Sequence, residues 1–231
     1  MEPESRALDA AVQKPIGDSD RPFLVIGLGN PGIEYQWTPH NAGFLAIDRL
    51  AARAGATVSN RRCRALTATT RIAGREVVLA KPETYMNLSG LSVQALLQEF
   101  GEEGAKRGSG LAERGSSFLV LYDELALPLG TLRVRAGGSS GGHNGARSIN
   151  GALGTEEWAR IRIGVGPDGL ETASRRGQDY LLTAMRKKEL AVLDEVLDRV
   201  AEAVETVIVS GVAAAMNKWN GPAGNDSSKA G

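Results

Sequence analysis

Cysteine and histidine are scarce in this sequence, and their scarcity excludes two kinds of stabilising framework. Cys63 is the single cysteine among 231 residues, so no internal disulfide can form and a reducing cytoplasm is the expected compartment. The two histidines, His40 and His143, together with one distant cysteine cannot supply the closely spaced ligands of a structural zinc site. Cys63 lies between arginines that could lower its thiol pKa, but we expect an unreactive thiol beside solvated charges.

Net charge and long apolar runs are also missing. Lysine plus arginine and aspartate plus glutamate each number 27, so no overall positive field attracts nucleic acid, and an RNA site must be a local cluster of basic residues. No apolar run is long enough to cross a bilayer, and the acidic N-terminal residues do not form a signal peptide. These absences predict a cytoplasmic protein that does not act at a membrane.

The length of the chain fits one substantial α/β domain, which we place at residues 21–219. Residues 1–20 and 220–231 are polar and aperiodic, and we expect both segments to be disordered. Residues 101–116 are rich in glycine and in charge, and we expect them to form a flexible surface insertion within the domain.

Apolar strands alternate with amphipathic helices along this domain. Continuous or alternating apolar patterns predict strands at 22–29, 66–72, 76–80, 118–124, a segment with Arg133 and Arg135 on one face, and 159–166. Helical spacing predicts helices at 42–54, at 91–100, from the glycine-rich loop to about 153, and through most of the last third. The alternation indicates a single α/β domain with a twisted, mixed and mostly parallel sheet flanked by helices.

Two glycine-rich motifs suggest activities that their context argues against. The first, Gly27-x-Gly29-x-x-Gly32, follows a strand as it does in dinucleotide-binding domains. Those domains need a helix to begin within the glycines, whereas Pro31 and Pro39 keep the next segment of this chain irregular. We therefore do not expect a nicotinamide or flavin site.

The second motif, GSSGG at 138–142, has the G-x-S-x-G pattern of serine esterases and lies between a strand and a helix. Such enzymes need an aspartate and then a histidine on separate, later loops. The one histidine after Ser140 is His143, on the same loop. A Ser140 nucleophile stays an alternative, but we prefer flexible glycines that let the backbone approach a substrate.

Polar side chains gather in loops that follow apolar strands, where open α/β sheets place their sites. They are Asn30, His40-Asn41, Met86-Asn87, Asp123-Glu124 and His143-Asn144. A neutral imidazole can deprotonate water, a carboxylate can orient that imidazole, and asparagine N–H groups can hold a carbonyl while its charge develops. The set suits ester hydrolysis without a metal, although a magnesium site made of carboxylates is left open.

The segments around these residues resemble the bacterial-type peptidyl-tRNA hydrolase family. The resemblance is carried in matching order by VIGLGNPGIEYQWTPHNAGF, KPETYMNLSG, YDELALPLG and GGHNGARSI, and it extends from about Phe23 to Trp219. It implies hydrolysis of the ester between a peptide and tRNA, which releases a reusable tRNA. It also implies that His40 is the general base, that Asp123 holds it in the active state, and that Asn30 senses the acylated α-amino group.

The same resemblance implies how peptidyl-tRNA, the expected partner, is bound. The residues placed along the channel for the peptide and the tRNA 3′ end are Tyr35, Tyr85, Met86, Asn87, His143 and Asn144. Arg135 and Arg162 would clamp the tRNA 5′ phosphate, and the alternative is that they are solvated strand charges. No cofactor, no metal and no obligate protein partner is expected, and the protein would act as a monomer.

Two positions depart from the family pattern. The family usually has arginine before the catalytic histidine, where this chain has Pro39, and often has histidine where this chain has Ser140. Neither change removes a proposed catalytic group, but the first could weaken a contact near the site. Chloroplast RNA-splicing factors resemble the same family without needing the hydrolase activity, so a non-enzymatic RNA-binding protein is a further alternative. The acidic start of the chain argues against the targeting segment that such a protein needs.

Overall fold

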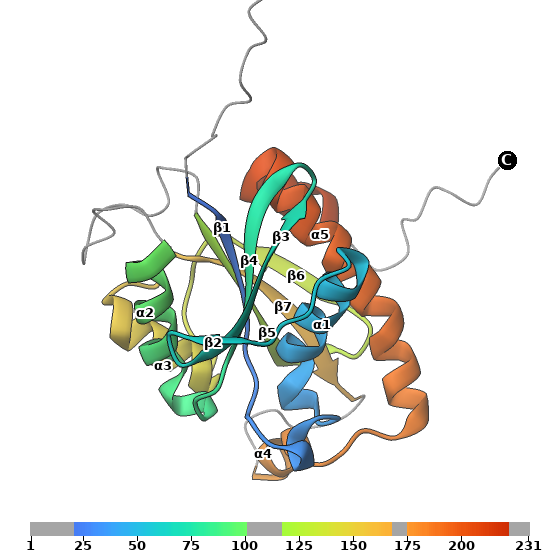
Figure 1. Ribbon diagram of the computed structural model, residues 1–231. Coiled ribbons are helices and arrows are strands. Elements are labelled where there is room, and N and C mark those ends of the chain that lie inside the picture. Colours follow the sequence, from blue (N-terminus) through green and yellow to red (C-terminus); the bar gives the residue numbers. More distant parts are fainter. Residues whose placement is uncertain (1–20, 101–116, 168–174, 222–231) are drawn as a thin grey trace, which may run out of the picture.

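The structure, a computed structural model, describes residues 21–100, 117–167 and 175–221 (Figure 1). The disorder expected for residues 1–20 and beyond 221, and the flexible insertion expected at 101–116, lie outside the described residues. Asn220, at the start of the expected tail, is held by the domain. Its side chain accepts a hydrogen bond from the backbone N–H of Val134 at 2.8 Å and donates one to the carbonyl of Val134 at 2.9 Å.

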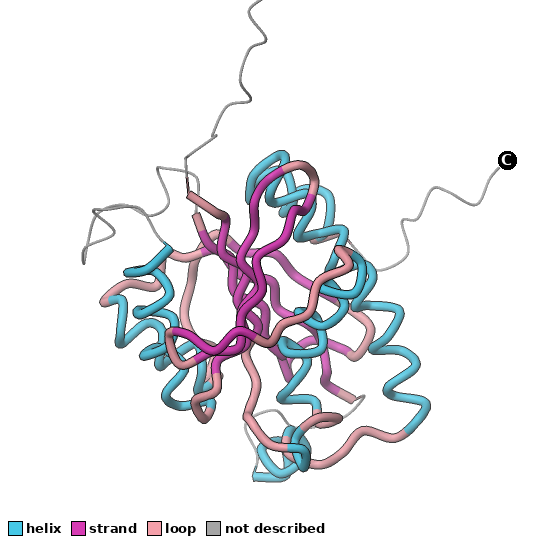
Figure 2. The backbone as a smooth tube through the Cα atoms, in the orientation of Figure 1, coloured by secondary structure: helices cyan, strands magenta, loops and turns pink. Residues whose placement is uncertain are grey.

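One twisted seven-stranded sheet forms the centre of the molecule (Figure 2). Its strands are β1 (Phe23–Gly27), β2 (Asn60–Arg62), β3 (Ala65–Ile72), β4 (Arg75–Pro82), β5 (Phe118–Pro128), β6 (Leu132–Arg135) and β7 (Ala159–Gly166). They are ordered β2-β3-β4-β1-β5-β7-β6. The four central strands run parallel, while β2, β3 and β6 pair antiparallel on the two sides. The single α/β domain with a mixed sheet is confirmed.

Helices cover both faces of this sheet (Figure 1). Helices α1 (Ala42–Arg53) and α5 (Lys187–Trp219) pack on one face, and α2 (Ser89–Phe100) and α3 (Asn144–Leu153) pack on the other. Alternate side chains of β1 enter the two cores, Phe23 and Val25 toward α1 and α5, and Leu24 and Ile26 toward α2 and α3. Because both faces are buried, the strand appears in the sequence as a continuous apolar run.

Most of the expected elements are confirmed, and the differences have simple causes. The hairpin turn falls at Ala73-Gly74 as predicted, with positive φ at both residues, which is the twist that a two-residue hairpin needs. Strand β2 was missed because its three residues are exposed and polar. Strand β5 runs four residues beyond its expected end, past a register shift after Glu124.

Helix α5 is long and apolar enough to cross a membrane by length and composition alone. Its apolar residues have another explanation, because Leu193, Val196, Val200 and Val204 pack into the core against the sheet. The helix is also interrupted at Gly211, where φ is 82° and ψ is 169°. These features describe a core helix of the domain.

Glycines allow α1 to approach the sheet unusually closely. A Cβ atom at Gly27 would lie 2.1 Å from the carbonyl oxygen of Gly43, and one at Gly43 would lie 2.4 Å from the carbonyl oxygen of Leu121. Two short 3-10 turns, η1 (Ile33–Tyr35) and η2 (Pro39–Asn41), separate the glycine motif from α1. The helix therefore begins well after the glycines, and the motif serves close packing.

We predict opposite effects for two glycine-to-alanine substitutions in helices. Gly151→Ala in α3 adds a methyl group to open space and should stabilise the protein by up to about 1 kcal/mol, the usual helix preference of alanine. Gly43→Ala should instead lower the free energy of unfolding by about 1–3 kcal/mol, because the backbone at Leu28 and Leu121 leaves no room. Urea unfolding measures both, and equal effects would contradict the packing argument.

Candidate active site

A cavity of about 810 Å³ opens at the end of the sheet where the parallel strands have their carboxyl ends. Its walls come from loops after β1, β4 and β6, from the second half of β5, from the start of α3 and from α4 (Arg175–Leu181). The predicted site residues that line it are Asn30, His40, Tyr85, Met86, Asn87, Asp123, His143 and Asn144. Segments that are far apart in the sequence are thus brought to one place.

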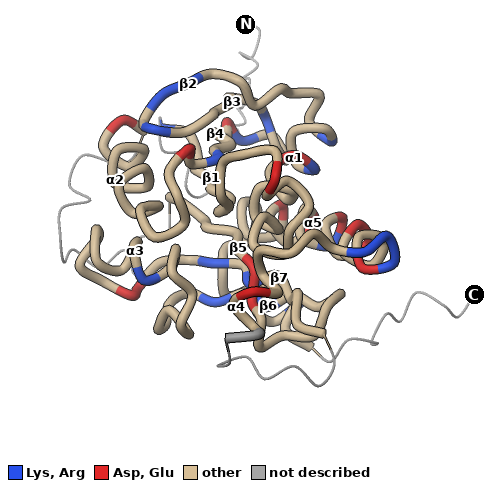
Figure 3. The backbone as a smooth tube through the Cα atoms, turned by 90° about the horizontal axis from the view of Figure 1, so that it is seen from below, with Lys and Arg blue, Asp and Glu red and all other residues tan. Residues whose placement is uncertain are grey.

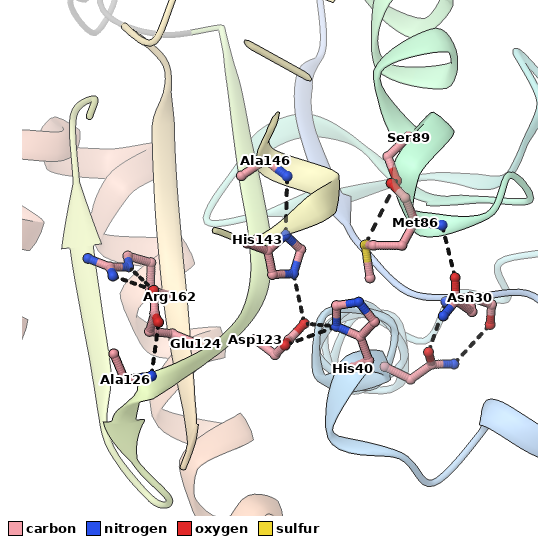
Figure 4. Close-up of polar contacts among 11 residues, drawn as sticks. Asn30, His40, Met86, Ser89, Asp123, Glu124, Ala126, His143, Ala146 and Arg162 are labelled. Carbon is pink, nitrogen blue, oxygen red and sulfur yellow. Dashed lines mark hydrogen bonds and ion pairs between the residues drawn. The ribbon is translucent and has the colours of Figure 1, made fainter. Parts of the chain in front are cut away.

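His40 and Asp123 form a buried pair in this cavity (Figure 4). The short turn η2 carries His40, and Pro39 is its first residue. Proline suits this position because the backbone N–H that it lacks would have no partner within the turn. Nδ1 of His40 lies 2.9 Å and 3.0 Å from the two carboxylate oxygens of Asp123, which lies within β5 rather than in a loop after it. A carboxylate can only accept, so Nδ1 carries the proton and Nε2 keeps its lone pair.

The charges of this pair support each other. Burial alone would raise the pKa of Asp123, whose exposed fraction is 1%, but the neighbouring imidazoles outweigh burial and hold its pKa well below the usual range. Burial lowers the pKa of His40, while the charge and hydrogen bond of Asp123 raise it, and the pKa lies above its ordinary value. The carboxylate is therefore ionised and able to stabilise a protonated His40.

His143 completes a row of three side chains, in which the Asp123 carboxylate lies between the imidazoles of His40 and His143. Its Nε2 lies 3.0 Å from Oδ1 of Asp123, and its Nδ1 accepts the backbone N–H of Ala146 at 3.1 Å, which caps α3 (Figure 4). By position alone, His40, Asp123 and His143 could hold a metal ion. The backbone donor at Nδ1 places the proton of His143 on Nε2, however, so this nitrogen has no lone pair for a metal.

Asn30 is fixed in orientation by three hydrogen bonds. Its backbone N–H and C=O pair with the side chain of Asn41 at 2.9 Å and 3.0 Å, and its Oδ1 accepts the backbone N–H of Met86 at 2.9 Å. Because Oδ1 is occupied, the amide group can offer the cavity its N–H donors. Asn41 was expected among the polar residues of the site but without a role of its own, and its bonds to Asn30 show that it holds that residue.

Asn144, at the start of α3, is oriented in a similar way. Its Oδ1 accepts a hydrogen bond of 2.5 Å from the guanidinium of Arg147, which leaves the amide N–H groups for a ligand. Tyr85 and Asn87 are exposed at the rim, and Met86 is buried below them. Tyr35 is half-buried in η1, and among the described residues it is not part of the cavity wall, so its substrate contact stays a prediction.

The arginines of β6 and β7 lie on one face of the sheet. Antiparallel pairing places Arg133 opposite Arg162 and Arg135 opposite Arg160, so the predicted pair, Arg135 and Arg162, are diagonal neighbours. Arg162 also forms an ion pair with Glu124, which lines the cavity. Elsewhere, charges of both signs are scattered along the described chain (Figure 3), consistent with its zero net charge.

The serine esterase interpretation finds no support in this geometry. Both ring nitrogens of His143 are engaged by Asp123 and Ala146, so this histidine cannot accept a proton from Ser140. Within the described residues, Ser140 is not part of the cavity wall. Cys63 is also poorly suited to react, because burial and the neighbouring carboxylate of Glu99 raise the pKa of its thiol to about 12.

Some residues of the site had no individual role assigned from the sequence. Glu124 was expected only as a member of the polar set, and Arg147 only as part of a motif, yet both line the cavity and hold other site residues. Gln178, Leu181 and Leu182 reach the cavity from α4. These contacts join residues up to 38 positions apart and become visible only in the folded chain.

The buried histidine–carboxylate pair lies at the carboxyl ends of the parallel strands, and its free lone pair faces a cavity lined by amides. This arrangement is suited to activating water for hydrolysis. A family model described as peptidyl-tRNA hydrolase matches residues 24–229 of this chain. The chain therefore belongs to the peptidyl-tRNA hydrolase family, and it is an enzyme of that class.

Individual relatives agree with this assignment. The chain is 59% identical over 198 residues to a peptidyl-tRNA hydrolase of Acidobacterium capsulatum, which covers 86% of this chain and 95% of the relative. It is 51% identical over 197 residues to that of Koribacter versatilis, covering 85% and 92%. The crystal structure of a peptidyl-tRNA hydrolase from Acinetobacter baumannii is 32% identical, covers 86% of this chain and 94% of that one, and gives a TM-score of 0.72.

We predict that metal removal leaves this enzyme active. Enzyme treated with a chelator and then desalted should hydrolyse untreated peptidyl-tRNA at the original rate, because hydrogen bonds engage Nδ1 of His40 and both ring nitrogens of His143, which leaves Nε2 of His40 as the one free imidazole lone pair of this group. Treating the enzyme alone keeps the magnesium that the tRNA needs. A loss of rate that one added metal ion restores would contradict this prediction.

Proposed function

We propose that this protein hydrolyses the ester between an N-blocked peptide and tRNA, with His40 as the general base. The observation that carries the proposal is the His40–Asp123 pair, whose free Nε2 faces a cavity beside the oriented amides of Asn30 and Asn144. The reaction needs no cofactor, and its products are a peptide and a tRNA that can be charged again. The reducing environment suited to a lone cysteine supports action in the cytoplasm. We also propose that the protein acts as a monomer, without a protein partner or a membrane.

His40 acts through Nε2 in this mechanism. It takes a proton from a water molecule whose oxygen attacks the ester carbonyl carbon, and Asp123 stabilises the imidazolium that results. The tetrahedral intermediate then collapses with cleavage of the bond to the tRNA ribose oxygen. The proton returns from His40 to that oxygen, so that the peptide leaves as an acid and the tRNA as an alcohol.

The two amides supply the other half of the chemistry. Asn30 and Asn144 have their oxygens engaged by Met86 and Arg147, so they present donors to carbonyl groups in the substrate and to the developing oxyanion. A blocked peptide N-terminus offers an additional carbonyl acceptor. A free α-ammonium group offers donors alone, which disfavours aminoacyl-tRNA at the same position.

We predict that His40→Ala lowers kcat by at least about two orders of magnitude, the usual effect of removing a positioned general base. The substrate is diacetyl-lysyl-tRNA, and Ser140→Ala is the matched control, which should stay within about twofold of wild type because Ser140 has no covalent role. Retained turnover in His40→Ala sinks the assignment of the base. An equally large loss in Ser140→Ala revives the serine mechanism. A wild type that binds tRNA without turnover would instead favour the RNA-binding alternative.

The pH dependence gives a second prediction for the same pair. Because Asp123 raises the pKa of His40, kcat/KM should fall as the pH drops through a midpoint above 6.5, where the base becomes protonated. Asp123→Asn removes the charge and should lower both the plateau rate and the midpoint. An unchanged midpoint in this variant, with normal folding by circular dichroism, would show that the pair is not coupled.

Arg135 and Arg162 provide a third prediction, on tRNA binding. Removing a phosphate contact weakens binding without altering the chemical step, so Arg135→Ala should raise KM with little change in kcat and should flatten the salt dependence. Arg162→Ala should do the same, with an added effect at Glu124, whose ion pair it breaks. Arg71→Ala, in an exposed position beside the β3–β4 turn, is the control.

The sharper form of this experiment changes the substrate. A tRNA without its 5′ phosphate should bind wild type less tightly, and the double variant of Arg135 and Arg162 should bind both tRNAs equally. If the double variant still distinguishes the two tRNAs as well as wild type, these arginines are solvated strand charges.

A further inference from the structure

His143 shares the catalytic carboxylate with His40, and its own protonation site is fixed by the backbone. The N–H group of Ala146 donates to Nδ1 at 3.1 Å, and a backbone amide cannot accept in return. The proton of the neutral ring is therefore on Nε2, from which it is donated to Oδ1 of Asp123 at 3.0 Å. His143 is a donor of fixed direction in this site, and it cannot serve as the base.

The same carboxylate oxygen, Oδ1 of Asp123, also lies 2.9 Å from Nδ1 of His40, and the two rings are 5.1 Å apart. Two donors thus draw on one buried negative charge. The hydrogen bond from His143 weakens the interaction of the Asp123 charge with a protonated His40. Tyr122 packs against the His143 ring at 4.6 Å and restricts its rotation.

Few other charges act on His40. Those on the described cavity wall are Glu124, which is paired with Arg162, and Arg147, which donates to Asn144. Tyr85 is the remaining titratable side chain of that wall, and α4 contributes amide and apolar groups to it. The balance between Asp123 and its two imidazoles therefore dominates the local field.

We propose that His143 is a positioning residue for the hydrolysis, whose fixed share of the Asp123 charge sets how readily His40 accepts a proton from water. This inference rests on the proposed role of His40 as the base. Without the second donor, the carboxylate would hold the protonated form of His40 more strongly. Less of the enzyme would then carry a free base at neutral pH.

Two substitutions separate the roles of the two ring nitrogens. In His143→Asn, the side-chain oxygen replaces Nδ1 as the cap of α3, a position that asparagine favours, but the donor to Asp123 is lost. In His143→Gln, the longer amide can still donate to Asp123, while the cap is weakened. His143→Asn tests the electrostatic coupling of His143 to His40 through Asp123. His143→Gln is the matched control for a structural effect of losing the cap.

The measurement uses the fact that the chain has two histidines. With ring ¹⁵N-labelled histidine, each variant shows the His40 ring alone, and its pKa is read by NMR without any assay. We expect His143→Asn to raise the pKa of His40 by about 0.5–1 unit and His143→Gln to change it by less than about 0.2 unit. In His143→Asn, kcat/KM below the midpoint should fall about three- to tenfold, and the alkaline plateau should stay within about twofold.

The outcomes distinguish this proposal from the proposed function. An unchanged pKa of His40 in His143→Asn overturns the coupling, and a uniform loss of rate at every pH beside that unchanged pKa gives His143 a purely structural role. If the pKa moves but the rate profile does not follow it, the coupling holds and the general-base assignment fails. Wild type provides a test that needs no variant, because a His143 spectrum with the proton on Nδ1 also overturns the proposal.

Discussion

The buried carboxylate of Asp123 is the constraint on which the rest of the site depends. A charge with 1% exposure is tolerated only when several donors satisfy it, and here the donors come from two distant segments, at His40 and His143. The turn before α1 and the glycine loop before α3 must therefore both close onto β5 at Asp123. The same two contacts that hold the charge also orient the histidine proposed as the base.

The fold supplies this meeting point through close packing. Gly43 lets α1 lie directly on β1 and β5, so the turn that carries His40 is fixed against the strand that carries Asp123. On the opposite face, α3 starts at its cap, His143, and packs with α2 over Tyr122. The distances from Asp123 to His40 and to His143 thus depend on how the starts of α1 and α3 pack on the sheet.

Patterns along the chain predicted the parts of this structure that local forces determine. The apolar runs of β1 and β5, the hairpin at Ala73-Gly74 and the apolar face of α5 all follow from burial and turn chemistry. The loops after the strands predicted which polar residues would meet, and His40 and Asp123 do meet. No local pattern encodes the ion pair of Glu124 with Arg162 or the bonds of Asn41 to Asn30, because these depend on strand order and on how loops close. The short exposed strand β2 lacked an apolar signal altogether.

The direction of the strands also gives the molecule two ends, and the one remote from the cavity is the better place for attached groups. Strands β1 and β5 begin side by side, with the backbone N–H of Leu24 bonded to the carbonyl of Ser117, and the cavity lies where these strands finish. The described residues Arg21 and Ser117, which precede these two strands, are therefore at the end of the sheet remote from the cavity (Figure 1). Affinity tags, fluorophores or surface tethers attached next to those residues would stay away from the cavity, which makes this end a suitable attachment site for single-molecule or immobilised formats.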